Sequence, residues 1–532
     1  MRLSVLGRAA VGAALLLAEY GIIGVCFDGG DLWRRGGFLA GLANAGQLFT
    51  ALIILITAGC LVHFRQLLLA VAEVSASSSA LSAGWAVAHL ALYGLSLLAA
   101  FAIFGPRRAH EIEISLVVLG AVAGAGALAA LMRALFGSSA LQLTKVLARA
   151  MAAGALLGVL AWQAGVRFQD AWPSLARVTL RFAAWLLGKL SGEPIYVDYA
   201  YAELGLRDFD VQIQAGCSGV EGMGLVFVFV AGYVFRFRGE LRIWRALSLL
   251  PVAVALAWLA NAFRLVALVA IGAWGAPAVA LGGFHSKAGW VLFCGVSLAL
   301  VLLLNHVRWF RRGAAVAPAE ATHNPTAGYC MPFLSLIGVG LVSGLFVAGQ
   351  LDRLYGLRLL AALAALAWAR RYWPELRPSW SWTALAWGAL VGAAWLLLLP
   401  QDVNANHELY AELAGLGGPL RLAWLSCRIL GSVLVVPVVE ELAFRGFLLR
   451  RLVSREFETV SYRDMSGFAL AVSALAFGAL HSSWRLGSLA GVAYALAARR
   501  RGRLADAMLA HATTNGLLAG WALWAARFDL LC

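Results

Sequence analysis

Long apolar runs alternate with short polar segments along most of the chain. A spanning helix needs about 20 apolar residues, and about fifteen runs approach that length. The first group is expected near residues 8–27, 37–63, 82–104, 113–133, 140–165, 214–235, 246–272 and 286–307. The second group is expected near residues 332–350, 356–370, 380–399, 421–449, 466–483, 486–498 and 503–526. The pattern predicts an all-α polytopic membrane protein with about 15 transmembrane helices in two bundles.

Two more polar segments interrupt these runs. Residues 167–212 are expected to form a small cap with some strand on the non-cytoplasmic side of the membrane. Residues 313–331 follow a basic stretch and are small and polar, which is typical of a linker. The sequence therefore predicts two transmembrane domains, residues 1–312 and 332–532, joined by this linker.

The composition agrees with a membrane location. The chain is 62% hydrophobic and 13% charged, with a mean hydropathy of +0.82, whereas a soluble domain is nearer half apolar and a quarter charged. No small-residue cleavage site follows the first apolar run, so this run is expected to remain as a transmembrane helix. The seven cysteines form no CxxC pair, so neither a disulfide framework nor a thiolate zinc site is expected.

The net charge of +15 reflects membrane topology rather than nucleic-acid binding. Arginines gather in short loops, which marks the cytoplasmic side. The clusters expected there lie at residues 236–245, 308–312, 370–371, 450–455 and 499–503. The loop 401–418 has no lysine or arginine and is expected on the opposite side, whereas the pairs at 34–35 and 107–108 do not fit the rule. No nucleotide-binding GxxxxGK[ST] loop is present, and no cofactor is expected.

Three polar residues are expected to meet at one face of the membrane. Cys217, Arg264 and His285 lie 19, 19 and 23 residues from the nearest cytoplasmic arginine cluster. These separations correspond to roughly 28–35 Å of helix, about one hydrocarbon thickness. All three residues are therefore predicted at the non-cytoplasmic ends of successive helices.

The chemistry of this trio suits acyl transfer. A cysteine thiolate is a nucleophile, and neighbouring cations favour the thiolate. His285 is placed to give a proton to a leaving amine, and Arg264 to stabilise an oxyanion. Asn261, one helical turn before Arg264, is placed to orient the guanidinium. The structural alternative is that Cys217 only packs, that the arginine is a snorkelling anchor and that the histidine is merely solvated.

The segments AGCSGVEGM, NAFRLV and FHSKAGWVLF carry these residues and resemble the three sequence blocks of the exosortases, in order. The resemblance covers roughly residues 1–312. It implies a bacterial membrane enzyme that cleaves a carboxy-terminal sorting signal on exported proteins and transfers the new carboxyl end to an acceptor. Carried over, Cys217 is the nucleophile, Arg264 stabilises the oxyanion and His285 is the acid and base.

The second half of the chain places charge inside an apolar run. Glu440 and Glu441 lie in SVLVVPVVEELAFRGFLLRRL, where an acid costs a few kcal/mol and is functional by default. Arg445 follows Glu441 at i+4, a spacing that allows an ion pair on one helix face.

Three further polar residues lie in the later spans, His481 at the end of LAFGALH and His511 and Asn515 within HATTN. In one interpretation Glu440 is a general base for water, His481 orients that water, and His511 and Asn515 donate to the oxyanion. A second interpretation is a zinc site, although HExxH is absent. A third is purely structural, with these polar groups holding helices together. The residues alone leave these alternatives open.

The same blocks are similar to those of the CAAX-protease and bacteriocin-processing family of intramembrane proteases. EExxxR occupies residues 440–445, FxxxH residues 477–481 and HxxxN residues 511–515, in family order. The resemblance covers roughly residues 332–532 and implies a glutamate-dependent peptidase without a metal, with the residue roles of the first interpretation.

The depth of His481 does not fit a simple topology. Glu440 and His511 lie 10 and 8 residues from the nearest cytoplasmic arginine, which places both roughly 12–15 Å deep. His481 lies 18 residues from Arg463, which would place it near the far side. Either its helix starts late and tilts, or this site crosses the bilayer differently.

The fusion of the two halves resembles the exosortase E type. It implies a bifunctional peptidase of the bacterial inner membrane whose partners are exported proteins with a Val-Pro-Glu-Ile-Asp type signal. One alternative is a single-site glutamate protease with an auxiliary docking domain. Another is a transporter, which predicts two similar halves with paired polar positions, and no such similarity is evident.

Overall fold

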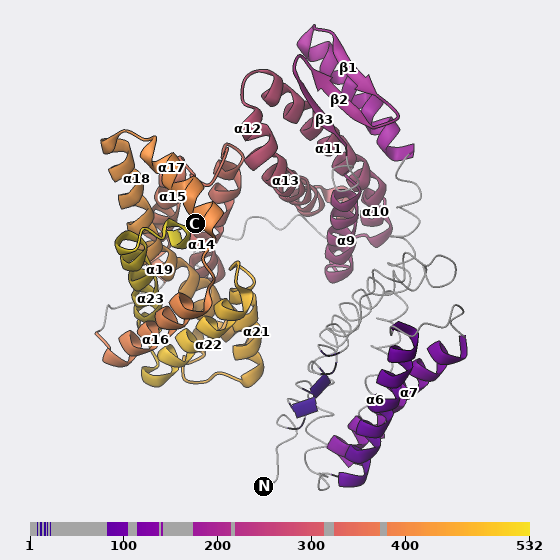
Figure 1. Ribbon diagram of the computed structural model, residues 1–532, viewed down its shortest axis with the longest axis vertical. Helices are drawn as coiled ribbons and strands as arrows, with labels where there is room; N and C mark the ends of the chain where they lie inside the picture. The colour runs from indigo at the N-terminus through magenta and orange to yellow at the C-terminus, as the bar shows by residue number, and fades with distance from the viewer. Residues whose placement is uncertain are drawn as a thin grey trace. The chain divides into compact units, whose positions relative to one another are not determined.

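The computed structural model describes residues 82–104, 114–137, 140–141, 174–213, 219–312, 324–372 and 380–531, with a few isolated positions before residue 23 (Figure 1). These residues form two compact units, 1–171 and 172–532. The spans predicted at 8–27, 37–63 and 140–165 lie outside the described residues apart from single positions.

The first unit contains a pair of long apolar helices. α6 (Ala83–Phe104) and α7 (Ile114–Phe136) pack against each other, and both are long and apolar enough to cross a membrane. Gly120 lies against Ala99, and the Ser96 hydroxyl donates to the Gly120 carbonyl at 3.1 Å. Small residues therefore bring these two helices close together, as is common between helices in membranes.

The second unit begins with the predicted cap. A helix at residues 174–191 precedes an antiparallel sheet whose strands are β1 (Ile195–Asp198), β2 (Glu203–Leu206) and β3 (Phe209–Gln212), in that order. Leu180 and Leu187 of the helix share one core with Leu204 and Leu206 of β2. The strand content expected from the sequence is confirmed, whereas the helix was not predicted.

The cap lies on the end of a long helix. The Phe209 ring packs against Gly272, where a Cβ atom would be only 2.3 Å from the ring. At the β2–β3 turn Arg207 forms a two-point ion pair with Glu193, with Nη2 2.6 Å from Oε1, and this guanidinium holds the pKa of the Glu193 carboxyl below its usual range.

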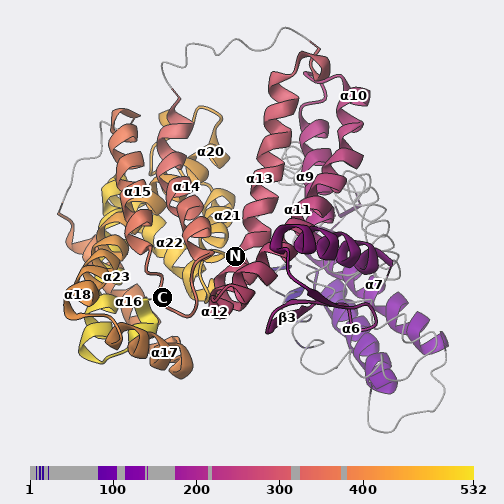
Figure 2. The ribbon, with the colours of Figure 1, turned by 90° about the horizontal axis from the view of Figure 1, so that it is seen from above.

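The three long helices α9, α11 and α13 run side by side beneath the cap (Figures 1 and 2). The elements of this region are α9 (Val220–Arg236), α10 (Ile243–Leu247), α11 (Leu249–Ala273), α12 (Pro277–Val279), the π-helical segment η3 (Ala280–Phe284) and α13 (His285–His306). Val226, Ala253 and Leu300 are fully or almost fully buried among α9, α11 and α13. The bounds of these three helices agree closely with three of the predicted spans.

The remaining elements form the second helical bundle of this unit. They are α14 (Pro325–Gly344), α15 (Tyr355–Ala369), α16 (Trp382–Leu398), α17 (Val403–Ala414), α21 (Gly467–Gly478), α22 (Trp484–Arg501), α23 (Leu504–Trp524) and one long helix over Gly418–Val453. The sequence did not predict α17, which is bent by 105° from α16. It also placed the start of α14 seven residues too late. Pro325 is the first helical residue, and the Asn324 side chain caps it by accepting from Ala327 N.

The long helix is built from five consecutive segments. They are α18 (Gly418–Leu430), the π-helical η6 (Gly431–Val435), α19 (Val436–Glu441), the π-helical η7 (Leu442–Leu449) and α20 (Arg450–Val453). Pro437 has no N–H, so the Val433 carbonyl lacks its regular helical partner just where η6 ends. π-helical turns interrupt α-helices most often at functional sites.

Six helices among the described residues are long and apolar enough to span a membrane, or seven if α16 and α17 form one bent span. The predicted all-α polytopic membrane fold is confirmed. The predicted number of about fifteen spans is not confirmed, because α21 and α9 are shorter apolar helices and several predicted spans lie outside the described ranges.

Candidate active sites

A cavity of about 430 Å³ opens between α9, α11 and α13. Arg264 of α11 and His285 of α13, which the sequence predicted to meet, both line it. Cys217 lies outside the described residues, two positions before Gly219, which also lines the cavity. The cavity is also lined by the apolar residues Leu225, Val226, Leu292, Phe293 and Val296.

Arg264 is held so that part of its guanidinium stays available. Its Nη1 donates to Asn261 Oδ1 at 3.4 Å, so the predicted contact between these two residues is confirmed. A Cβ atom at Gly289, one turn after His285, would lie 3.2 Å from the same Nη1. The Arg264 Nε is buried and has no hydrogen-bond partner among the described residues. A fixed cation with an unused donor suits the stabilisation of an oxyanion.

His285 is the first residue of α13 and follows an irregular turn. Gly282 within η3 has φ −87° and ψ −107°, outside the helical region. The His285 N–H donates to the Ala280 carbonyl five residues back, which is the π-helical pattern. The irregular turn therefore sets the direction in which His285 enters the cavity.

Gly219 fits its position for two separate reasons. It is the N-cap of α9 with φ 83°, in the left-handed region that costs other residues about 1–2 kcal/mol. A Cβ atom there would also lie 2.7 Å from Asn261 Nδ2. The backbone just after Cys217 thus touches the residue that contacts Arg264.

We expect Gly219→Ala to lower the Cys217-dependent turnover by about tenfold or more, since it displaces both the backbone after Cys217 and Asn261. Gly224→Ala on the same helix is the matched control, because a Cβ atom there would meet nothing within 4 Å. Initial rates of substrate processing by the two purified variants would measure the difference. Equal rates would contradict the tight packing around Gly219.

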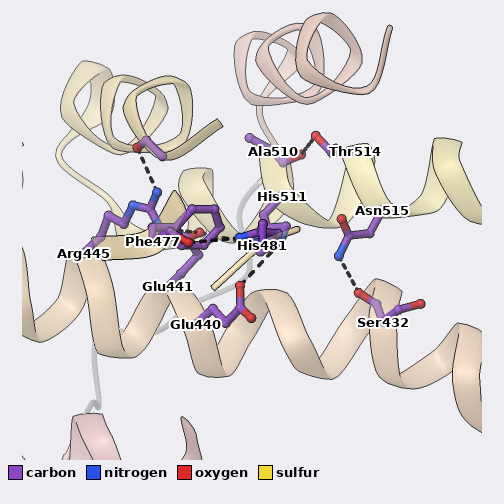
Figure 3. A network of polar contacts seen from close by, with 11 residues as sticks. Ser432, Glu440, Glu441, Arg445, Phe477, His481, Ala510, His511, Thr514 and Asn515 are labelled. Atoms are coloured by element: carbon purple, nitrogen blue, oxygen red, sulfur yellow. Dashed lines mark hydrogen bonds and ion pairs between the residues drawn. The ribbon is translucent and has the colours of Figure 1, made fainter. Parts of the chain in front are cut away.

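A second polar cluster lies in the core of the other bundle. Glu440 and Glu441 project from the long helix toward His511 of α23, with Arg445 one turn further along (Figure 3). The exposed fractions are 8% for Glu440, 0% for Glu441, 1% for Arg445 and 3% for His511. Four ionisable groups buried this fully must compensate one another.

Arg445 compensates Glu441. Its Nη1 lies 3.0 Å from Glu441 Oε1, so the predicted i,i+4 ion pair is confirmed. Its Nη2 donates to the Gly491 carbonyl at 2.8 Å, and the guanidinium carbon lies 4.2 Å from the centre of the Phe477 ring. Ion pair, hydrogen bond and cation–π contact together fix the guanidinium.

His511 connects the two glutamates. Its Nδ1 lies 3.1 Å from Glu441 Oε1, and its Nε2 lies 4.0 Å from Glu440 Oε2. Glu440 Oε2 is buried and has no hydrogen-bond partner among the described residues. An unpartnered buried carboxylate oxygen beside an imidazole is a suitable place for a reacting water.

Two aromatic rings hold His511 in its orientation. Tyr494 stacks on it with 4.7 Å between ring centres and 16° between ring planes, and Phe477 meets it edge-on at 5.6 Å. Both rings are almost fully buried. Sequence reasoning missed Tyr494. The available signal was a lone tyrosine among the small, apolar residues of α22.

The place of His481 in the fold follows from the short helix before it. α21 has only 12 residues, or about 18 Å, which is less than the bilayer core. His481 lies just after its end, where Nδ1 bonds the Phe477 carbonyl at 2.9 Å and the ring meets Trp395 edge-on. Since Phe477 contacts both histidine rings, His481 lies near the same cluster as His511.

Asn515 lies beside the long helix. Its Nδ2 donates to the Ser432 carbonyl, within the π-helical segment η6, at 2.8 Å (Figure 3). An amide nitrogen carries two hydrogens, so one donor is still available. No group of three or more His, Cys, Asp and Glu side chains within the described ranges is arranged as a metal site.

Comparisons with known families agree with this division of sites. Residues 422–517 match the description Type II CAAX prenyl endopeptidase Rce1-like, and residues 32–303 match Transmembrane exosortase (Exosortase_EpsH). Searches of curated proteins and of solved structures gave no match. Two peptidase-related families on an all-helical membrane fold define a multi-pass membrane peptidase. The exosortase match covers more than half of the chain, and the chain belongs to the transmembrane exosortase family.

Proposed function

We propose that the protein is a bifunctional membrane peptidase with a cysteine transpeptidase site and a glutamate-dependent intramembrane endopeptidase site. The cavity that Arg264 and His285 share with Gly219, next to Cys217 in sequence, supports the first activity. The buried cluster of Glu440, Glu441, Arg445 and His511 supports the second activity. The proposal assigns residues 1–312 to the first activity and residues 332–532 to the second, with 313–331 as linker.

At the first site, the Cys217 thiolate attacks the carbonyl carbon of the scissile peptide bond. The oxygen becomes an oxyanion that the Arg264 guanidinium stabilises. His285 gives a proton to the leaving nitrogen, the C–N bond breaks, and a thioacyl bond remains on Cys217. An acceptor nucleophile then loses its proton to His285, attacks the thioacyl carbon and releases the thiolate.

At the second site, Glu440 takes a proton from a water held near its unpartnered Oε2. The resulting hydroxide attacks the peptide carbonyl, and His481 orients the water. His511 and the remaining N–H of Asn515 donate to the oxyanion. Glu441 and Arg445 keep the His511 ring in place, and the proton on Glu440 then passes to the leaving amine.

The substrates that fit this proposal are exported proteins anchored by a carboxy-terminal sorting signal, of the Val-Pro-Glu-Ile-Asp type that the exosortase E resemblance implies. Exported proteins reach the non-cytoplasmic side of the bacterial inner membrane, which is the side on which we place the cleavage site. The apolar lining residues of the cavity support this class, because they offer a surface for apolar substrate groups.

Trapping of the thioacyl bond tests the first activity. The chain would be co-expressed with a tagged exported protein that ends in such a signal, and a hydroxylamine-sensitive covalent adduct would be sought. We expect an adduct in the wild type and none in Cys217→Ala or His285→Ala. If no adduct forms, while processing persists in Cys217→Ala and stops in Glu440→Ala, the chain is a glutamate protease with an auxiliary membrane domain.

A further inference from the structure

The turn that carries His285 is bonded to the helix bundle of the second site. Both segments belong to the same compact unit, residues 172–532. The backbone N–H of Gly283, two residues before His285, donates to the Val347 carbonyl at 2.8 Å. Val347 lies in the turn that follows α14, so an element of the other bundle bonds the backbone next to the proposed acid and base.

Glycines allow this contact on both sides. A Cβ atom at Gly283 would lie 2.1 Å from the Gly344 carbonyl oxygen and 2.6 Å from that of Val347. A Cβ atom at Gly344 would lie 3.3 Å from Cγ of Lys287, whose alkyl stem crosses that position. Both glycines are buried. The two backbones therefore meet directly, at a distance that only glycine permits at Gly283.

The contact also lies beside the irregular geometry of η3. Gly282 is outside the helical region, and the N–H of the next residue, Gly283, donates to the Val347 carbonyl. A buried N–H needs such a partner.

We propose that the last residue of α14 and the turn after it, residues 344–347, position His285 for the cysteine reaction. The bundle that carries the glutamate site thereby also serves as a structural support for the first site, which gives the fusion a physical role. The inference rests on the proposed function of His285 as acid and base.

The test uses the full-length protein with one variant on each side of the contact. Gly283→Ala pushes the turn away from α14, and Gly344→Val pushes Lys287 and the turn from the other side. Gly295→Ala on α13 is the matched control, since a Cβ atom there meets nothing within 4 Å. Each variant is assayed for Cys217-dependent turnover, with kcat and KM determined separately, and for glutamate-site cleavage.

We expect both contact variants to lower kcat of the Cys217-dependent reaction by about tenfold to a hundredfold at unchanged KM, as a small misplacement of a catalytic group does. Glutamate-site cleavage and the Gly295→Ala rates should stay at wild-type level, which also shows that the variants fold. Equal loss at both sites would mean a general packing role and would overturn the inference, as would wild-type kcat in both variants. A turnover that does not depend on Cys217 in the wild type would instead refute the proposed function.

Discussion

Glu440→Gln is expected to lower peptide cleavage at the second site by about 10²–10⁴-fold, the usual contribution of a general base. Glutamine has nearly the same shape, so the buried position is still filled, but it does not accept a proton from water. Because Glu440 Oε2 has no hydrogen-bond partner among the described residues, the substitution breaks no hydrogen bond at that oxygen. The loss should therefore be chemical and not structural.

Cleavage of an intramembrane peptide substrate in detergent or liposomes would measure this effect, with Cys217-dependent turnover measured in the same samples. Glu456→Gln, at an exposed glutamate outside the cluster, is the matched control. If Glu440→Gln retained second-site cleavage, the general base would be Glu441 or His511 instead.

Arg445→Leu is expected to destabilise the second bundle by about 3–5 kcal/mol, the usual result of removing one partner from a buried ion pair. Arg445 is 1% exposed and Glu441 is 0% exposed, so the remaining carboxylate would lie uncompensated in the core. The variant would also remove the side-chain donor to the Gly491 carbonyl. The paired variant Glu441→Leu/Arg445→Leu should lose less stability, because it removes both charges.

Thermal unfolding of the purified proteins in detergent, followed by tryptophan fluorescence, would compare the two variants. The decisive result is which of the two variants unfolds at the lower temperature. A double variant that is as unstable as Arg445→Leu, or less stable, would show that the uncompensated charge is not the cause.

Apolar length was sufficient to locate most helices, because a bilayer allows few other structures. Apolar length did not predict the helix starts and short helices that depend on local sequence. Pro325 was assigned to the linker, although proline with a preceding asparagine starts a helix. The helix α17 was missed because Leu409 and Leu413 are its only buried residues, and its other face is polar. Such a short amphipathic helix has no long apolar run to reveal it.

The polar residues of both candidate sites were proposed from the sequence, but most of their contacts and the stacking of Tyr494 on His511 were not. The spacing of Glu441 and Arg445 was enough to predict an ion pair, because both lie on one helix. The proximity of His511 to both glutamates depends on how α23 packs on the long helix. The position of His481 depends on the end of α21 at Gly478, and no apolar pattern indicates that the chain turns there.

The π-helical segment η7 also determines which way the end of the long helix faces. One additional residue in a helical turn rotates everything after it by about 100°. Arg450, the first residue after η7, is 4% exposed, and its guanidinium carbon lies 4.5 Å from the Tyr462 ring centre and 5.2 Å from that of Tyr329. In a regular α-helix the same arginine would be rotated by about 100° around the helix axis. Glu440 and Glu441 therefore face the buried cluster at one level of the helix (Figure 3), and Arg450 faces the rings of Tyr329 and Tyr462 at the next.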